Sequence, residues 1–241
     1  MDNEKIDFHN LKKYSYHLIS IYDINNSPRT SDASCFLIIK NKELYLVTAL
    51  HVFSGWNPLN GEYIETPDLI LLILNNKKTN KKEFEKITIP KFFNNEVNKK
   101  INEKPDLFFY KLNNNLLQTF EINTLNDFLI ENKNNEKKLY VYGFKSPKQR
   151  DKVINLQDQI NYESELDHIS IINEEFDNFN YKSKSELNVI KPGYSGAPLF
   201  SFDNNQCFFE GMCISGSPNN VDYPEIIAIS PKTFYNFYNK I

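Results

Sequence analysis

The sequence predicts an all-β fold of two similar halves, closed by one helix at the C-terminus. Short apolar or alternating runs recur along most of the chain, separated by polar turns at intervals of roughly 8 to 12 residues, as in sandwiches and barrels. Strands and helices do not alternate in the way that a parallel sheet requires. With 241 residues, of which 40% are hydrophobic, the chain can bury a large core without a disulfide or a metal.

The first half contains about six strand-like runs. They are residues 14–22, 33–39, 43–48, 69–74, 83–89 and 107–110. The second and third of these runs form a hairpin with a turn at Asn41 and Lys42, and the hairpin leads directly to His51. The last run follows immediately after Asp106. Two segments outside the runs, 8–11 and 125–130, are candidates for short helices.

The second half contains seven short strand-like runs, close to the number in the first half, and is expected to form about six strands. They are residues 138–144, 151–156, 168–173, 185–190, 197–201, 207–214 and 226–229. Ser230 followed by Pro231 is typical of a helix start, with serine as the N-cap and proline at the first helical position. Four apolar residues then lie at helical spacing and are expected to pack on the domain: Phe234, Phe237, Tyr238 and Ile241.

These elements divide the chain into five parts of a single unit. The parts are a polar lead-in at 1–12, a first barrel-sized half at 13–120, a connection at 121–137, a second half at 138–229 and a C-terminal helix at 230–241. We found no repeat in the sequence itself, so the doubling is inferred from the number of elements in each half.

Charge and cysteine content narrow the classes of function. The net charge of −3 provides no general attraction to nucleic acid or to an anionic membrane. The N-terminal residues are polar, and no run reaches the 18 or so apolar residues of a spanning helix, so we expect a cytoplasmic protein with no membrane partner. Cys35, Cys207 and Cys213 lack CxxC spacing and are expected to be buried reduced thiols. We expect no metal and no organic cofactor.

The segment 191–200, Lys-Pro-Gly-Tyr-Ser-Gly-Ala-Pro-Leu-Phe, has the composition of a turn that presents a nucleophile. Ser195 lies between Gly193 and Gly196, which leave room for a substrate carbonyl beside the hydroxyl. Gly193 can adopt a backbone conformation that other residues avoid, so that its N–H and that of Ser195 point at one spot. Two such fixed donors form an oxyanion hole, in which each is worth about 3 kcal/mol.

A serine nucleophile needs a base, and the base needs an acid. His51 follows a strand and is the candidate base, while Asp106 precedes another strand and is the candidate acid. The histidine would accept the proton of Ser195, and the carboxylate would fix the tautomer of the imidazole. Each motif alone is only weak evidence for this chemistry. Their order and their distribution over both halves predict acyl transfer by a serine.

Other residues compete for these roles. Asp68 also precedes an apolar run and is the second candidate for the acid. It follows His51 too closely, however, for a strand and its return to lie between them. His9, His17 and His168 are more readily explained as structural or surface residues than as the base. The Lys/Asn-rich stretch 75–104 also carries several glutamates, so a solvated loop explains it better than a nucleic-acid surface.

Together the three motifs resemble those of the trypsin/chymotrypsin-type serine proteases, and most closely of bacterial trypsin-like peptidases related to the HtrA/Deg proteases. Leu-Val-Thr-Ala-Leu-His51 resembles Thr-Ala/Asn-x-His. Asp106-Leu-Phe-Phe-Tyr-Lys-Leu resembles Asp-Leu-Ala-Val-Leu-Lys-Val, and Gly193-Tyr-Ser-Gly-Ala-Pro-Leu resembles Gly-Asn/Asp-Ser-Gly-Gly-Pro. The resemblance covers about residue 14 to the C-terminus.

The resemblance implies two perpendicular six-stranded Greek-key β-barrels, with the triad in the cleft between them. It also implies that the segment 211–217 pairs with substrate, so that Ser215, Gly216 and Ser217 contribute to substrate binding. The base of the primary specificity pocket lies six residues before the serine in the family, which here is Val189. An apolar residue there predicts a small or medium apolar side chain at the cleaved bond instead of Arg or Lys.

The sequence departs from the digestive members of the family at Tyr194, where those proteases carry an Asp that receives a new N-terminal ammonium. We therefore expect no activation by that route. The expected function is a cytoplasmic serine endopeptidase of protein or peptide substrates, regulated by a protein partner, without a PDZ-like domain. Such proteases resemble effectors of bacterial stress or antiphage defence. The alternative is an inactive trypsin-fold module that binds a peptide.

Overall fold

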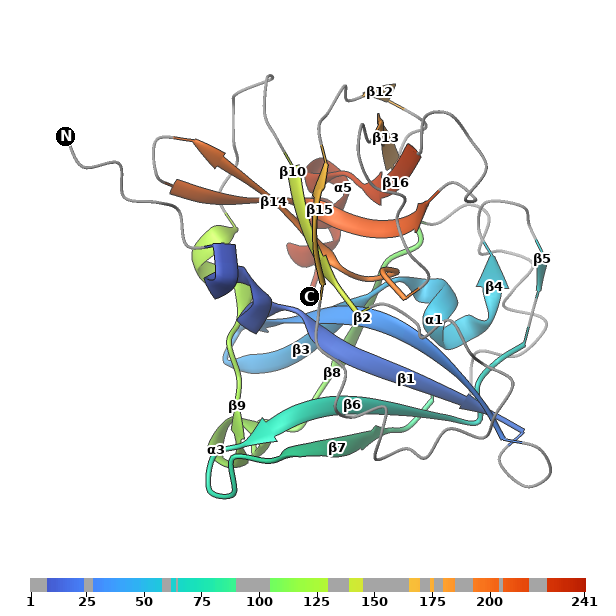
Figure 1. Ribbon diagram of the computed structural model, residues 1–241, viewed down its shortest axis with the longest axis vertical. Helices are drawn as coiled ribbons and strands as arrows, with labels where there is room; N and C mark the ends of the chain where they lie inside the picture. Colours follow the sequence, from blue (N-terminus) through green and yellow to red (C-terminus); the bar gives the residue numbers. More distant parts are fainter. Residues whose placement is uncertain are drawn as a thin grey trace.

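The structure of the protein is a computed structural model, which describes residues 8–23, 28–57, 62–63, 65–89, 105–129, 139–144, 165–169, 174–175, 180–184, 193–203, 206–216 and 225–241. Two antiparallel sheets dominate it, one in the lower half of Figure 1 and one in the upper half. The predicted two-part, mostly β architecture with a C-terminal helix is confirmed.

The first sheet is built from the first half of the chain. Its order is β7 (Lys82–Ile87), β6 (Leu69–Asn76), β1 (Tyr16–Tyr22), β2 (Arg29–Lys40), β3 (Glu43–Thr48) and β8 (Phe108–Lys111), with β9 (Phe120–Glu121) beside β6. The predicted hairpin joins β2 to β3, where Lys40 pairs with Glu43. Asn41 and Lys42 both have positive φ, 51° and 66°, which is the mirror-image turn that suits the twist of a two-residue hairpin.

The second sheet is built from the second half. Its order is β11 (Glu165–Ile169), β10 (Leu139–Gly143), β14 (Pro198–Asp203), β15 (Gln206–Gly216), β16 (Glu225–Ile229), β13 (Asn180–Lys184) and β12 (Glu174–Glu175). β14 and β15 form a hairpin immediately after the candidate nucleophile turn. This hairpin therefore ties the turn to the centre of the second sheet.

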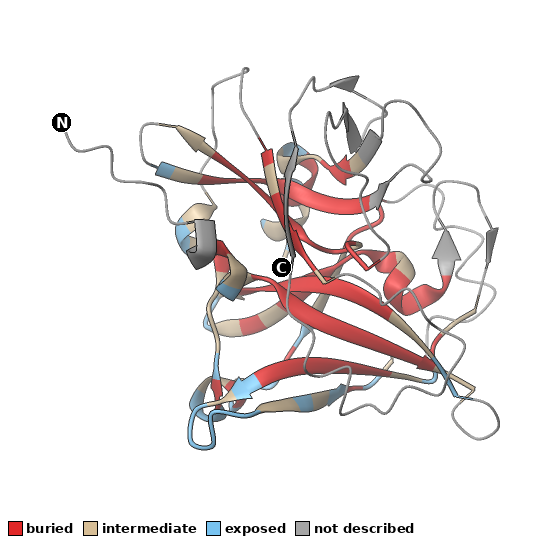
Figure 2. Cartoon of the chain, viewed as in Figure 1, coloured by how far each residue is buried: buried red, intermediate tan, exposed pale blue. Residues whose placement is uncertain are grey.

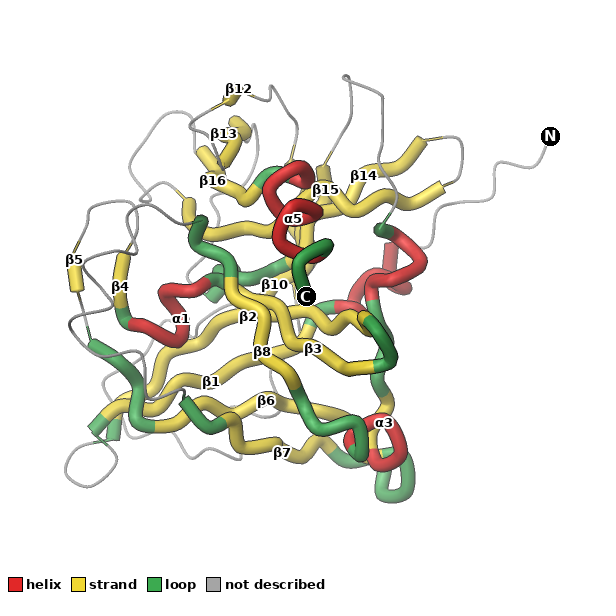
Figure 3. Tube along the Cα trace, turned by 180° about the vertical axis from the view of Figure 1, so that it is seen from behind, coloured by secondary structure: helices red, strands yellow, loops and turns green. Residues whose placement is uncertain are grey.

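One apolar core is shared by both sheets and the C-terminal helix α5 (Pro231–Tyr238), and Figure 2 shows in red the buried residues along both sheets. The rings of Phe36 in β2 and Phe209 in β15 lie 5.3 Å apart, and Phe234 of α5 lies 4.7 Å from Phe209. The view from behind in Figure 3 shows α5 beside the strands of both sheets. As predicted, Ser230 caps the helix, because its side chain accepts a hydrogen bond from the N–H of Thr233 at 3.1 Å.

Several local features differ from the expectations. Residues after β3 do not continue as a strand but form the short helix α1 (Leu50–Ser54). The sequence did not predict helix α3 (Leu116–Thr119), strand β9 or the ribbon of β4 (Trp56–Asn57) and β5 (Glu62–Tyr63). The two expected short helices occur as 3₁₀ turns, η1 (Phe8–Tyr14) and η3 (Leu125–Phe128). β11 begins before the expected run 168–173, and the expected strands at 151–156 and 185–190 lie outside the described residues.

The expected closure into two barrels is not seen among the described strands. β7 and β8 end the path of the first sheet, and β11 and β12 end that of the second. In the part of the chain that the structure describes, no helix is long and apolar enough to cross a membrane.

The three cysteines are free thiols, as predicted. Cys35 and Cys213 are buried, and Cys207 is partly buried. Burial raises the pKa of the Cys35 thiol well above its ordinary value and that of Cys207 to about 12. Both thiols are therefore protonated near neutral pH.

Candidate active site

His51 lies on α1, which starts two residues after β3 and turns the chain away from the first sheet. The helix ends at Gly55, whose φ of 69° is left-handed and whose N–H donates to the carbonyl of His51 at 2.9 Å. A side chain at Gly55 would lie 2.0 Å from the carbonyl oxygen of Glu65, so only glycine fits there. The backbone around His51 is thus fixed by a one-turn helix with a glycine cap.

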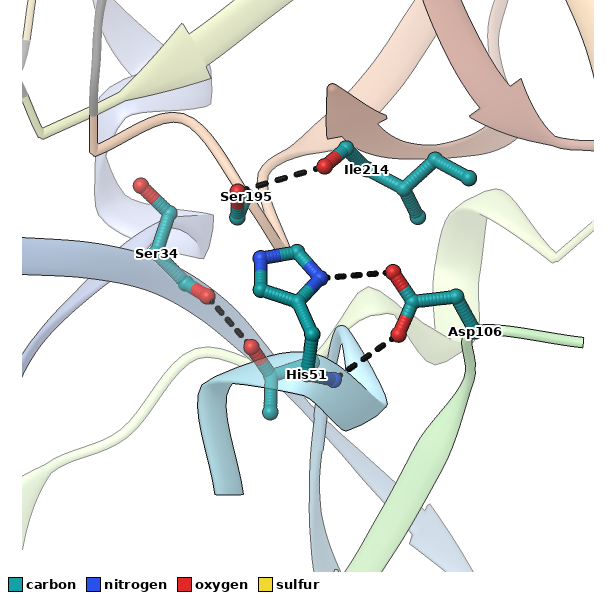
Figure 4. A network of polar contacts seen from close by, with 6 residues as sticks. Ser34, His51, Asp106, Ser195 and Ile214 are labelled. Atoms are coloured by element: carbon teal, nitrogen blue, oxygen red, sulfur yellow. Dashed lines mark hydrogen bonds and ion pairs between the residues drawn. The ribbon is translucent and has the colours of Figure 1, made fainter. Parts of the chain in front are cut away.

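Asp106 reaches His51 because β8 pairs with β3. Thr48 lies opposite Phe108, which places the residue two positions before β8 beside the start of α1. Oδ2 of Asp106 lies 2.6 Å from Nδ1 of His51, and Oδ1 of Asp106 accepts the backbone N–H of His51 at 2.8 Å (Figure 4). The Asp106 side chain is only 2% exposed, against 26% for His51. The buried carboxylate therefore orients an imidazole whose other edge faces the surface.

Burial and Asp106 have opposite effects on the pKa of His51. Burial lowers the pKa of the imidazole, but the charge of Asp106 and the hydrogen bond to it outweigh burial, so the pKa is raised above the ordinary histidine value. The carboxylate favours the tautomer with a proton on Nδ1, which leaves Nε2 as the acceptor. This is the state that a general base needs.

Ser195 lies on a turn with two left-handed glycines. Gly193 has a φ of 103° and Gly196 a φ of 89°. The N–H of Ala197 donates to the carbonyl of Tyr194 at 2.9 Å, and the N–H of Gly196 donates to the carbonyl of Cys213 in β15 at 2.7 Å. Within the described part of the chain, the N–H groups of Gly193 and Ser195 donate no hydrogen bond. Both predicted oxyanion donors are thus left available by the residues around them.

The hydroxyl of Ser195 donates to the carbonyl of Ile214 at 3.2 Å. Figure 4 shows the side chain of Ser195 above the imidazole of His51, with the carboxylate of Asp106 to the right of the ring. No hydrogen bond joins Ser195 to His51 among the described residues. In this structure the hydroxyl therefore donates to the Ile214 carbonyl and not to the imidazole.

Tyr194 occupies the position where digestive trypsins carry an acid, and it is buried in the second sheet. The residue is 1% exposed and belongs to a small apolar cluster with Leu139, Val141, Ala197, Leu199, Cys213 and Ala228. Its ring lies against Gly143 at the end of β10, where a Cβ atom would be 2.6 Å from the ring. The turn is thus anchored by an aromatic ring packed on a glycine.

The competing candidates lie elsewhere. Asp68 is exposed at the start of β6, where its backbone N–H donates to Ile21. His17 forms a buried pair with Asp32 at 2.8 Å within the first sheet. The side chains of His9 and His168 lie outside the described residues.

The predicted substrate-binding residues are described only in part. Val189 and Ser217 lie outside the described residues, as does the side chain of Ser215. The backbones of Ser215 and Gly216 pair with Ile227 and Ile226 of β16. The pairing of β15 with β14 extends only to Met212, so among the described strands the edge of residues 214–216 opposite β16 is left unpaired.

Neither a family model nor a curated protein matches the sequence. Solved structures of serine proteases do match the fold. The thermostable serine protease AL20 from an extremophilic microorganism aligns with a TM-score of 0.57 at 10% identity, covering 95% of this chain and 96% of that chain. The protease Anisep from Arthrobacter nicotinovorans aligns with a TM-score of 0.54 at 13% identity and the same coverage.

The active form of the Rv3671c protease from M. tuberculosis aligns with a TM-score of 0.52 at 11% identity, over 99% of this chain and 85% of that chain. The chain has the trypsin-like fold. In this trypsin-like fold the imidazole of His51, the carboxylate of Asp106 and the turn of Ser195 come from three separate segments. Ser34, which the sequence did not single out, also contacts the turn from β2.

Proposed function

We propose that the protein is a serine endopeptidase that hydrolyses peptide bonds through Ser195, His51 and Asp106. The observation that carries this proposal is the double contact of Asp106 with His51, which holds the imidazole beside a glycine turn bearing a serine. The trypsin-like fold supports the proposal, because the three solved structures with this fold are proteases.

In the acylation step, Oγ of Ser195 attacks the carbonyl carbon of the substrate while Nε2 of His51 takes the hydroxyl proton. The carbonyl oxygen becomes an oxyanion, which the N–H groups of Gly193 and Ser195 stabilise. The tetrahedral intermediate collapses as the C–N bond breaks, and the imidazolium returns the proton to the leaving amine. Asp106 stays ionised and stabilises the imidazolium.

In the deacylation step, a water molecule replaces the amine. His51 takes one proton from water as the oxygen bonds to the acyl carbon, and a second tetrahedral intermediate forms in the same oxyanion hole. Its collapse breaks the bond to Oγ of Ser195, and the imidazolium returns the proton to that oxygen. The products are a carboxylic acid and the free enzyme.

The substrate is proposed to bind as an extended strand along residues 214–216 of β15. The open edge opposite β16 provides backbone donors and acceptors for it. Val189 at the expected base of the specificity pocket favours a small or medium apolar residue before the cleaved bond.

A peptide-library cleavage profile tests this function. Wild-type protein should cleave a subset of peptides after small or medium apolar residues, and Ser195→Ala, purified in the same way, should cleave none. Equal cleavage by both proteins would assign the activity to a contaminant. A folded wild type that cleaves no peptide would favour the alternative.

That alternative is an inactive module that uses the same site to bind a peptide. It is favoured by the hydrogen bond between Ser195 and the Ile214 carbonyl, which directs the nucleophile away from His51. Binding without cleavage would appear as saturable binding of library peptides that persists in Ser195→Ala.

We further propose that the protease is restrained in the bacterial cytoplasm by a partner protein and serves as an effector of stress or antiphage defence. The contact of the Ser195 hydroxyl supports restraint, because the hydroxyl donates to the Ile214 carbonyl instead of to His51. A relation to the HtrA/Deg proteases rests on the three sequence motifs. Rapid digestion of casein by the isolated protein would contradict the proposed restraint.

A further inference from the structure

Ser34 is a buried serine of the first sheet that binds the nucleophile turn of the second half at two points. It lies in β2 and is 0% exposed. Its hydroxyl donates to the carbonyl of Gly193 at 2.8 Å, and its backbone N–H donates to the carbonyl of Ser195 at 2.8 Å. Figure 4 shows Ser34 on one side of Ser195 and Ile214 on the other. One residue thus holds both ends of the three-residue segment that carries the oxyanion donors.

Ser34 is itself held by surrounding residues. Its hydroxyl oxygen accepts the N–H of Phe144 at 2.9 Å, and its carbonyl accepts the hydroxyl of Thr48 at 2.8 Å. A Cβ atom at Gly196 would lie 2.0 Å from the carbonyl oxygen of Ser34 and 2.2 Å from the Thr48 hydroxyl. The contact between β2 and the turn is therefore close at Gly196, and the hydroxyl, N–H and carbonyl of Ser34 are all hydrogen-bonded.

The two carbonyls that Ser34 binds determine how the intervening peptide is oriented. Each peptide unit is planar, so fixing the carbonyls of Gly193 and Ser195 fixes the planes on either side of the unit that carries the Ser195 N–H. The Gly193 carbonyl lies in the peptide unit that follows its Cα, and rotation of this unit is little restricted by glycine itself, which has no side chain and adopts a φ of 103°. The hydroxyl of Ser34 restricts the rotation of this unit.

We propose that Ser34 is a positioning residue of the active site, which holds the segment Gly193–Ser195, and with it the N–H of Ser195, in the orientation that binds an oxyanion. The inference rests on the proposed protease function and adds to it a residue that acts through the turn. The loss of an oxyanion donor costs about a hundredfold or more in rate, and a displaced donor costs part of that. Removal of the Ser34 hydroxyl should therefore slow chemistry at Ser195 by at least about tenfold.

Ser15 provides a matched control. It is also buried, and its hydroxyl also donates to a backbone carbonyl of the other sheet, that of Tyr142 in β10, at 2.8 Å. Among the described residues it makes no hydrogen bond to the segment Gly193–Ser195. Ser15→Ala therefore removes a comparable buried hydrogen bond between the two halves without releasing the turn. Its effect on stability should resemble that of Ser34→Ala, whereas its effect on chemistry should not.

The experiment measures phosphonylation by an alkyl fluorophosphonate. In this reaction Oγ of Ser195 bonds to phosphorus, the P–F bond breaks, fluoride leaves and His51 takes the hydroxyl proton, while the phosphonyl oxygen occupies the oxyanion hole. For each protein we measure the maximal rate constant of labelling at saturating probe and the probe concentration that gives half of this maximal rate constant. The proteins are wild type, Ser34→Ala, Ser34→Cys and Ser15→Ala. Thermal unfolding is recorded for each protein.

We expect the maximal rate constant to fall at least about tenfold in Ser34→Ala and in Ser34→Cys, whose thiol is a weak donor of similar shape. The half-saturating concentration should change less than about twofold, and Ser15→Ala should react within about twofold of wild type. If Ser34→Ala does not fold, Ser34→Cys decides. A wild-type rate in folded Ser34→Cys, or equal slowing in Ser15→Ala, would overturn the inference. Absence of labelling in folded wild type would instead refute the protease function, and this inference with it.

Discussion

Asp106 holds His51 through both of its carboxylate oxygens. One oxygen lies 2.6 Å from Nδ1 of the imidazole, and the other accepts the backbone N–H of the same histidine at 2.8 Å. The second contact fixes the main chain at the start of α1, and the first fixes the ring upon it. The orientation of the base therefore depends on a single buried side chain, which makes it directly testable.

Asp106→Asn should lower kcat by about ten-thousandfold, because an amide at this position favours the wrong imidazole tautomer. Asp68→Asn is the matched control, since Asp68 was the competing candidate and is exposed at the start of β6. It should leave kcat within about twofold of wild type. Steady-state kinetics on the best library peptide provides the measurement. A large loss in Asp68→Asn together with normal activity in Asp106→Asn would refute the assignment of the acid.

The pH dependence of kcat/KM should report His51. The base must be neutral to accept a proton, so activity should rise with pH as the imidazole deprotonates. Because Asp106 raises the pKa of His51, the midpoint of this rise should lie above the ordinary histidine value. In Asp106→Asn only burial remains, and burial lowers the pKa, so the midpoint should shift to lower pH. An unchanged midpoint in this variant would contradict the proposed electrostatics.

Tyr194 should stabilise the fold through its buried ring. Tyr194→Ala should lower the free energy of unfolding by about 3–5 kcal/mol, the range for large-to-small changes of buried aromatic residues. Tyr140→Ala removes the same atoms from a half-buried position of β10 and should cost clearly less. Urea unfolding of both variants measures the difference. Equal losses would show that the ring of Tyr194 is not the anchor of the nucleophile turn.

Features determined by nearby residues could be predicted from the sequence. The turn at Asn41 and Lys42 and the cap at Ser230 each depend on a few adjacent side chains, and both occur as expected. Helix α1 could not be predicted from its short apolar run, because it is ended by a left-handed glycine packed against Glu65. The open sheets likewise reflect pairing between distant strands, which periodicity does not specify.

The residues of the candidate site likewise divide into those that the local sequence predicts and those that only the three-dimensional packing reveals. His51, Asp106 and Ser195 were found because each chemical role requires a particular residue type in a recognisable local pattern. Ser34 has no such pattern, and its hydroxyl meets Gly193 across 159 residues of sequence. The anchoring of Tyr194 likewise depends on Gly143 in a different strand. Contacts of this kind follow from the packing of the two sheets and need the three-dimensional structure.

The most direct test of the proposed function is to identify the residue that a fluorophosphonate modifies in the folded protein. Mass spectrometry of the digested protein should find the phosphonyl group on Ser195, and modification should be lost in His51→Ala and after denaturation. Such a result requires an activated serine, an adjacent base and a formed oxyanion hole together. A folded wild-type protein that remains unmodified at Ser195, or is modified equally well in His51→Ala, would contradict the assignment of this site as a serine protease.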